Sequence, residues 1–296
     1  MQINNFIFDF FPRKFAHKAL YYKKIFTSAV IKRELKNLKN LKNVRKSNKC
    51  FIVGTGPSLK DVSLCSLMEH DIFLTGESYL HPDVDKLINP YYFSGTNHPP
   101  FGIDYVYKLH ERLERLPSST KYIFSHTGYE HSFGNYFFGK GSFLSNREKY
   151  LINYTGAVDL DRYCADDSKV FDISKNPFNP RTVVFTALQT AIFMGYKNIY
   201  LIGCEHDYIL RFFNSDFSNH HFYSDDKSNS SDIEGYLQEF SLFEWFKEYY
   251  KRWEAYIHIN KHCKSRSISI INCTPRSVLD VFPKVDLKDA LVNEHL

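Results

Sequence analysis

The chain has 296 residues, of which 43% are hydrophobic and 24% charged, so one large α/β domain or two modest ones can bury a substantial core. Six cysteines are scattered without a C-x-x-C pair, a pattern that favours buried free thiols in a reducing compartment over disulfides or a zinc site. The sequence has no apolar run long enough to span a membrane, and its N-terminus does not show the order of charged, apolar and small residues that a signal peptide has. We therefore predict a cytoplasmic protein.

The net charge of +5 is unevenly distributed along the chain. Residues 1–50 carry thirteen Lys and Arg against two acids, a net +11, whereas the remainder carries 25 basic and 31 acidic residues, a net −6. Apolar residues recur with loosely helical spacing among these lysines, as is typical of a segment on an anionic membrane surface. We predict a basic amphipathic helical extension over residues 1–48, peripheral at the inner face of the plasma membrane. Packing of this helix on its own domain is the alternative, and no nucleic-acid-binding module is present.

The first strand of the main domain is predicted at Phe51–Val53, and it enters a glycine-bracketed turn, Gly54-Thr55-Gly56. Pro57 and Ser58 are expected to open a helix, whose free N–H groups and dipole would form a phosphate site. The turn has neither the third glycine of a dinucleotide fingerprint nor the Gly-Lys-Ser/Thr of a Walker loop. It therefore predicts a nucleotide site of another kind, and a glycine-rich turn without a phosphate role is the alternative.

Strands and helices are expected to alternate along the rest of the chain. Further strands are predicted at 71–74, 91–94, 121–125, 198–202 and 267–272, and helices at 62–69, 103–116, 182–194 and 237–262. This alternation predicts a doubly wound, mostly parallel, Rossmann-like α/β sheet within residues 49–296. The aromatic-rich stretch 127–165 has no clear period, so we expect a lid-type insertion rather than sheet, with a second lid-type segment at 204–233.

Ligands of such sheets bind beyond the carboxyl ends of the strands. That rule is expected to gather the loops at 54–58, 76–78, 95–97 and 204–208 around one cleft.

Three blocks of the chain resemble a known group of enzymes. Phe51–Val62, Thr186–Tyr208 and the tail Ile271–Leu287 are similar to signatures of bacterial glycosyltransferases that include the family-42 sialyltransferases and relatives from surface-polysaccharide clusters. The resemblance spans roughly residues 50–287. It implies a single Rossmann-like domain that binds a CMP-activated sugar without a divalent metal. It also implies a histidine base and tyrosines that contact the departing phosphate.

The donor-binding residues follow from the loop and from this resemblance. By position, the resemblance assigns Gly54, Gly56, Pro57 and Ser58 to the donor loop, Asn97 to an asparagine after the third strand, and Tyr208 to a phosphate contact. The full predicted donor-binding set is Gly54, Thr55, Gly56, Pro57, Ser58, Asn97, Thr182 and Glu205. The chain departs from the family pattern where Gly76 replaces an asparagine, Val183-Val184 replace Ser-Gly, and Glu205 replaces an aspartate. These departures bear on the identity of the donor sugar more than on the fold.

Inverting transfer needs a base near the acceptor hydroxyl, and imidazole suits this role near neutral pH. His206, His220 and His221 lie in or beside the long loop after the strand at 198–202. His221 is the first choice, because the family's base lies in the corresponding loop; His206 and Tyr208 complete the predicted catalytic set. A hydrogen-bonded or surface histidine is the alternative for each.

Glu205, His206 and Asp207 are contiguous, so their side chains diverge and no metal site is predicted. Glu205 is interpreted as a ribose ligand or a residue that shapes the loop.

The sequence thus predicts a metal-independent glycosyltransferase that moves a sialic or other nonulosonic acid from a CMP-linked donor to a lipid-linked surface glycan. The predicted partners are the nucleotide sugar, the lipid-linked acceptor and an anionic membrane; nucleic acid is excluded, and a homo-oligomer is left open. One alternative is an ATP- and magnesium-dependent enzyme like the archaeal-type 6-hydroxymethylpterin diphosphokinases, whose G-x-G-P-S-L and G-Y-K signatures are similar. A non-catalytic peripheral membrane scaffold is the other.

Overall fold

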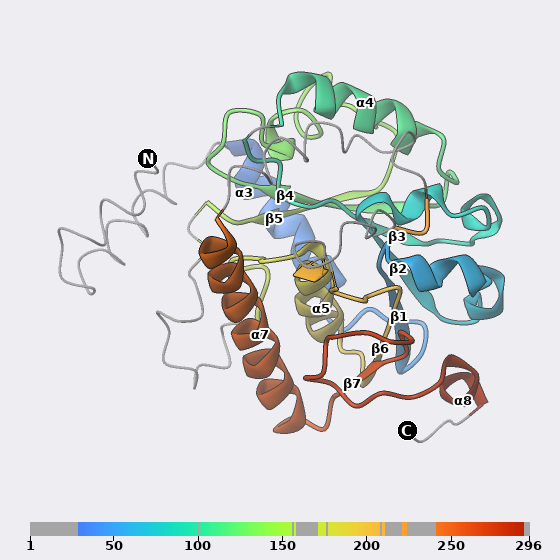
Figure 1. Cartoon of the computed structure of the whole chain (residues 1–296). Coiled ribbons are helices and arrows are strands. Elements are labelled where there is room, and N and C mark those ends of the chain that lie inside the picture. The colour runs from blue at the N-terminus through green and yellow to red at the C-terminus, as the bar shows by residue number, and fades with distance from the viewer. Residues whose placement is uncertain are drawn as a thin grey trace.

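A single seven-stranded parallel sheet organises the chain (Figure 1). The computed structural model describes residues 29–99, 101–155, 157, 171–175, 177–207, 209–210, 221–223 and 241–292. The strand order is β5-β4-β3-β2-β1-β6-β7, and all six neighbouring pairs are parallel. The strands are β1 (Lys49–Val53), β2 (Asp71–Thr75), β3 (Tyr91–Phe93), β4 (Lys121–His126), β5 (Lys149–Asn153), β6 (Asn198–Ile202) and β7 (Ser269–Asn272). The predicted α/β fold is confirmed.

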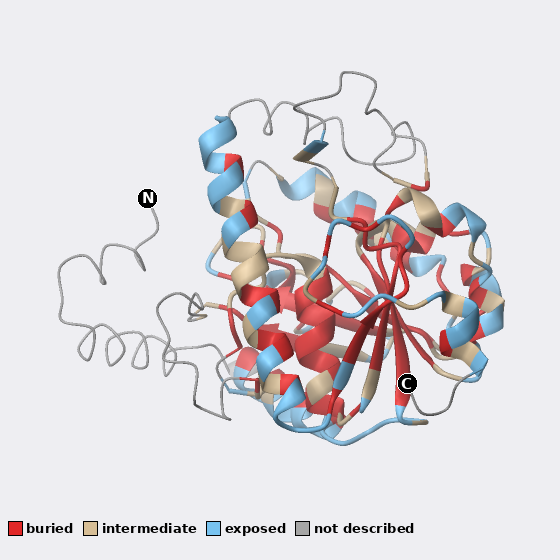
Figure 2. Cartoon of the chain, turned by 60° about the horizontal axis from the view of Figure 1, so that its bottom comes forward, coloured by how far each residue is buried: buried red, intermediate tan, exposed pale blue. Residues whose placement is uncertain are grey.

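The central strands are buried on both faces, which explains their continuous apolar runs. Every residue of β1 is buried, and its side chains alternate between two hydrophobic clusters. Cys50 and Ile52 pack on one face of the sheet, whereas Phe51 and Val53 pack on the other. Figure 2 shows this burial running through the sheet. The five described cysteines are free thiols, as predicted.

Helices cover both faces of the sheet. They are α3 (Ala29–Leu38), α4 (Ile103–Glu114), α5 (Val183–Met194), α7 (Leu242–Lys264) and α8 (Leu287–Val292). Helices α5 and α7 pack in one hydrophobic cluster, and α4 and α8 in the other (Figure 1). The predicted ends of α5 are confirmed: the Thr182 side chain accepts a hydrogen bond from the Phe185 N–H at 3.2 Å, and Gly195 ends the helix with a φ of 89°.

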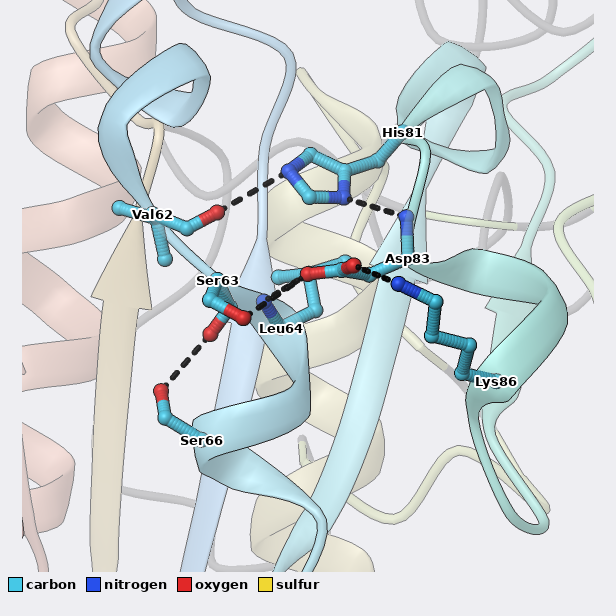
Figure 3. Close-up of polar contacts among 7 residues, drawn as sticks. All are labelled: Val62, Ser63, Leu64, Ser66, His81, Asp83 and Lys86. Carbon is cyan, nitrogen blue, oxygen red and sulfur yellow. Dashed lines mark hydrogen bonds and ion pairs between the residues drawn. The ribbon is translucent and has the colours of Figure 1, made fainter.

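The helix predicted at 62–69 is wrong. The segment after β1 forms two 3₁₀ turns instead, η2 (Pro57–Asp61) and η3 (Leu64–Leu67). Figure 3 shows the reason: the Val62 carbonyl lies 3.1 Å from His81 Nε2, and the Leu64 N–H donates to Asp83 Oδ2 at 3.0 Å. The Val62 carbonyl is thus occupied by a later segment of the chain and does not accept within a helix, while Asp83 holds the Leu64 end of the segment in place.

The lid-type insertion predicted at 127–165 is also wrong for much of its length. It contains β5, which pairs in parallel with β4 at the edge of the sheet. The aromatic side chains of this stretch belong to the core, since Phe133, Phe137 and Phe138 are buried and the ring centroids of Phe124 and Phe137 lie 4.1 Å apart. Most of the second lid-type segment, 204–233, lies outside the described residues.

The described part of the basic extension packs on the domain. Helix α3 lies against the edge strand β5, and Ile31 and Leu38 are buried there. Leu41, just beyond α3, is buried as well. The alternative interpretation of the extension therefore holds from residue 29 onward, whereas residues 1–28 lie outside the described part. None of the described helices is long and apolar enough to cross a membrane.

Candidate functional site

The topology places a switch point between β1 and β6. The chain builds the sheet outward from β1 to β5 and then returns to add β6 on the other side of β1. Loops 54–58 and 203–207 follow these two strands and meet at the carboxyl edge, by which we mean the edge of the sheet where the strands end. The Gly56 N–H donates to the Gly203 carbonyl at 2.8 Å. Parallel sheets bind ligands at such a point, so the predicted location of the site agrees with the fold.

The two glycines of the glycine loop, residues 54–58, serve packing between these loops. A Cβ on Gly54 would lie 2.2 Å from the Gly203 carbonyl oxygen, and one on Gly56 would lie 1.5 Å from Glu205 Oε2. The Ser58 N–H donates to Glu205 Oε1 at 2.7 Å. The expected phosphate site at a helix start is thus corrected in two respects. The segment is a five-residue 3₁₀ turn, and a carboxylate of the chain itself already accepts from the Ser58 amide.

Glu205 is a buried carboxyl with opposing influences on its charge. Its residue is only 5% exposed, and this burial raises the pKa of Glu205. Hydrogen bonds from Ser58 lower that pKa, and the nearby Asp207 raises it. Glu205 Oε2 has no hydrogen-bond partner among the residues that the structure describes. A buried acceptor without a partner is costly, so it indicates a position where a ligand group or water bonds.

Residues 221–223 lie against the glycine loop. The Phe222 N–H donates to the Thr55 carbonyl at 3.0 Å, and the Phe222 side chain is buried. Tyr223 Oη donates to Glu77 Oε2 at 2.6 Å, next to the end of β2. The His221 ring stacks on the Tyr223 ring with centroids 4.8 Å apart. The structure therefore brings His221, the favoured base, to the carboxyl edge beside the glycine loop.

The charges of Asp207 and His221 interact at the carboxyl edge. Burial raises the pKa of the Asp207 carboxyl, and the neighbouring His221 imidazole acts in the opposite direction. A carboxylate near an imidazole stabilises the protonated ring because opposite charges attract. This arrangement suits a histidine that accepts a proton.

His206 occupies a different environment. His206 Nε2 lies 2.7 Å from Tyr256 Oη, which lies 2.9 Å from Thr182 Oγ1. Burial, and then the nearby Arg252 guanidinium, lowers the pKa of His206 to about 3. The ring is neutral at pH 7 and a poor proton acceptor. His206 and Thr182 thus connect β6, α5 and α7 through Tyr256, which favours the hydrogen-bonded interpretation of His206.

Acidification is expected to destabilise the protein through His206. In the unfolded chain this residue binds a proton below its ordinary pKa of 6.5, whereas in the folded chain it does so only near pH 3. The free energy of unfolding therefore decreases as the pH is lowered from 6.5 toward 3. One such proton contributes up to about 2 kcal/mol between pH 6.5 and pH 5. Urea unfolding of the wild type and His206→Asn at both pH values measures it. Asparagine suits the positive φ of 57° at this position. Equal losses of stability in the two proteins would contradict the prediction.

Further unpartnered polar atoms lie along the carboxyl edge. Asn97 is buried beyond β3; its Nδ2 donates to the His131 carbonyl at 2.7 Å, while its Oδ1 has no partner among the described residues. Within the described part of the chain, four more buried side-chain atoms at or just beyond strand ends have no partner, namely Ser78 Oγ, Ser94 Oγ, Ser125 Oγ and Asn153 Nδ2. Buried polar groups are normally bonded, so these exceptions are positions where a polar ligand or ordered water could bond.

Some predicted residues lie outside the described part of the chain, namely Tyr208 and His220. Sequence reasoning missed Tyr256, and it placed Glu77 in a loop of the cleft without giving it a role. Tyr256 lies on α7, 50 positions after His206, and no local pattern pairs the two residues. Glu77 directly follows the glycine after β2, so its place at a strand end was a usable signal.

Among the described residues, no group of three His, Cys, Asp or Glu side chains could hold a metal ion, and Glu205 and Asp207 are therefore not part of such a group. No family model matches the chain, and comparisons with curated proteins and with solved structures find no significant match.

Proposed function

We propose that the chain is a glycosyltransferase that uses a nucleotide sugar. The observation that supports this most directly is the position of His221 beside Asp207 at the β1–β6 switch point, next to the glycine loop. Nucleotides bind at such points in parallel sheets, and a histidine with a nearby carboxylate can deprotonate a hydroxyl. The unpartnered polar atoms along the same edge suit a ligand rich in hydroxyl groups.

In the proposed reaction, His221 removes the proton from the acceptor hydroxyl, and the negative charge of Asp207 stabilises the imidazolium that forms. The acceptor oxygen forms a bond to the anomeric carbon of the donor sugar as the bond from that carbon to the phosphate oxygen breaks. The bonding electrons leave with the nucleotide phosphate, so charge and atoms balance without an oxidant or reductant.

The choice of donor and acceptor follows from the resemblance described above. It favours a CMP-linked sialic or other nonulosonic acid and a lipid-linked bacterial surface glycan. We propose that the protein works in the cytoplasm at the inner face of the plasma membrane. Because α3 packs on the domain, the proposed contact with anionic lipid depends on residues 1–28, which carry five basic residues and one acid.

A nucleotide screen tests the proposal. Cytidine nucleotides are expected to raise the melting temperature of the folded protein more than UDP, GDP or ATP, because a ligand that binds only the native state stabilises it. Transfer or donor hydrolysis is then measured with CMP- and UDP-sugars. A folded protein that responds to none of these compounds would contradict the proposal.

Among the described residues, nothing favours the ATP-dependent alternative. That chemistry holds magnesium with one or two carboxylates and the phosphates of ATP, and the described residues contain no group of three His, Cys, Asp or Glu that would mark a dedicated metal site. The screen addresses this alternative directly, since magnesium-dependent stabilisation by ATP alone would support it.

A further inference from the structure

The glycine loop already contains an anion. The Glu205 carboxylate accepts the Ser58 N–H at 2.7 Å through Oε1. Its other oxygen, Oε2, lies over Gly56, in the space that a Cβ would fill. This is the place where a ligand phosphate is usually found in loops of this kind. In this chain the carboxylate comes from the loop that follows β6, the strand next to β1 in the sheet.

The backbone holds Glu205 firmly in this position. Its carbonyl accepts from the Val278 N–H at 2.9 Å and lies 3.2 Å from Ser277 Oγ. On the loop side, the Gly54 N–H donates to the Ile202 carbonyl at 2.8 Å. The segment after β7 therefore fixes the Glu205 backbone and the end of β6 fixes the glycine loop, so the occupied state belongs to the fold and not to a mobile surface side chain.

This occupancy changes what the loop can bind. Two anions repel each other, and their repulsion is stronger in a buried site than in water. A phosphate is therefore disfavoured at the Ser58 amide while Glu205 is ionised. Glu205 Oε2, in contrast, is a buried acceptor without a partner among the described residues. A neutral group with an O–H to donate fits this oxygen, and leaving the oxygen unbonded is unfavourable.

We infer that Glu205 is the resident anion of the glycine loop, and that its Oε2 accepts a hydroxyl of the bound nucleotide sugar while the phosphate binds elsewhere on the carboxyl edge. The inference rests on the proposed function for the identity of the ligand. The hydroxyl belongs either to the ribose or to the transferred sugar. In both cases Glu205 selects a hydroxyl-bearing group, and the loop does not anchor the phosphate.

Binding measurements on the full chain test the inference. The proteins are the wild type, Glu205→Gln, Glu205→Ala, and Glu69→Gln as a control for removing an exposed charge far from the loop. The probes are CMP, its 2′-deoxy and 3′-deoxy analogues, CMP-sialic acid and inorganic phosphate. Glu205→Gln preserves the size of the side chain and guards against a variant that fails to fold.

For a ribose hydroxyl, the wild type is expected to bind CMP at least about tenfold more tightly than one deoxy analogue, since the buried oxygen loses its partner. Both Glu205 variants then lose most of that preference, and Glu69→Gln keeps it. For a hydroxyl of the sugar, the analogues bind like CMP, and the Glu205 variants lose affinity only for CMP-sialic acid. Inorganic phosphate should stabilise Glu205→Ala more than the wild type, because only the variant frees the Ser58 amide.

Several outcomes would overturn the inference. Unchanged binding of CMP and CMP-sialic acid by both Glu205 variants excludes the hydroxyl contact. Ser58→Pro lacks the amide of the glycine loop. If phosphate stabilises the wild type saturably and this effect disappears in Ser58→Pro, phosphate binds at the amide and Glu205 is not the resident anion. A wild type that binds no nucleotide contradicts the proposed function and the hydroxyl contact, while the phosphate measurement still decides whether Glu205 fills the loop.

Discussion

Replacing Gly56 with alanine is expected to lower the free energy of unfolding by about 3 kcal/mol, the upper part of the usual range for overpacking a buried site. The added Cβ would lie 1.5 Å from Glu205 Oε2 and 2.3 Å from its Cδ. Movement of the buried carboxylate away from the new Cβ strains its hydrogen bond from the Ser58 N–H, and the Gly56 N–H is bonded to the Gly203 carbonyl. Urea unfolding monitored by circular dichroism measures the loss.

A double-mutant cycle identifies the cause of that loss. Gly56→Ala in the background of Glu205→Ala should be much less damaging than in the wild type, because the colliding side chain is gone. Gly95→Ala is the matched control, since a Cβ at Gly95 meets no atom within 4 Å, and its effect should stay within about 1 kcal/mol. Additive losses in the cycle would show that Glu205 is not the obstacle.

The sheet was predictable because its strands are buried on both faces. Such strands appear in the sequence as continuous apolar runs. The ends of β2 and β6 were therefore predicted to within one residue. The edge strand β5 was missed for the corresponding reason. Its first two residues, Lys149 and Tyr150, are only partly buried, and the surrounding aromatic residues masked its short pattern. The absence of a helix at 62–69 depends on His81 and Asp83, which act from about twenty residues away.

The location of the candidate site was predictable, but the roles of its residues were not. A parallel sheet places its strand ends together, so the loops after β1 and β6 had to meet. The sequence gives no sign that Gly56 makes room for a carboxylate, because that requires the register between β1 and β6. His221 was preferred over His206 only through the family resemblance, because their different surroundings, Tyr256 for His206 and the charge of Asp207 for His221, depend on tertiary structure.

The second large effect is expected at His221. His221→Ala should lower kcat by about 10²- to 10⁴-fold, the usual contribution of a general base, while nucleotide binding stays close to that of the wild type. Binding is preserved because the segment remains attached through the Phe222 N–H and the Tyr223 hydroxyl. Transfer kinetics and a nucleotide thermal shift, measured on the same preparation, separate the two quantities.

His70→Ala is the matched control, since His70 lies just before β2 at the opposite edge of the sheet, where its Nδ1 is 3.4 Å from Ser47 Oγ. Its kcat should stay near that of the wild type. Asp207→Asn should give a smaller loss than His221→Ala and should lower the pKa seen in the pH dependence of kcat, because the imidazolium loses a neighbouring negative charge. If His221→Ala keeps its turnover, or loses nucleotide binding along with it, a base at this position is excluded, and the proton must be accepted by another group on the carboxyl edge.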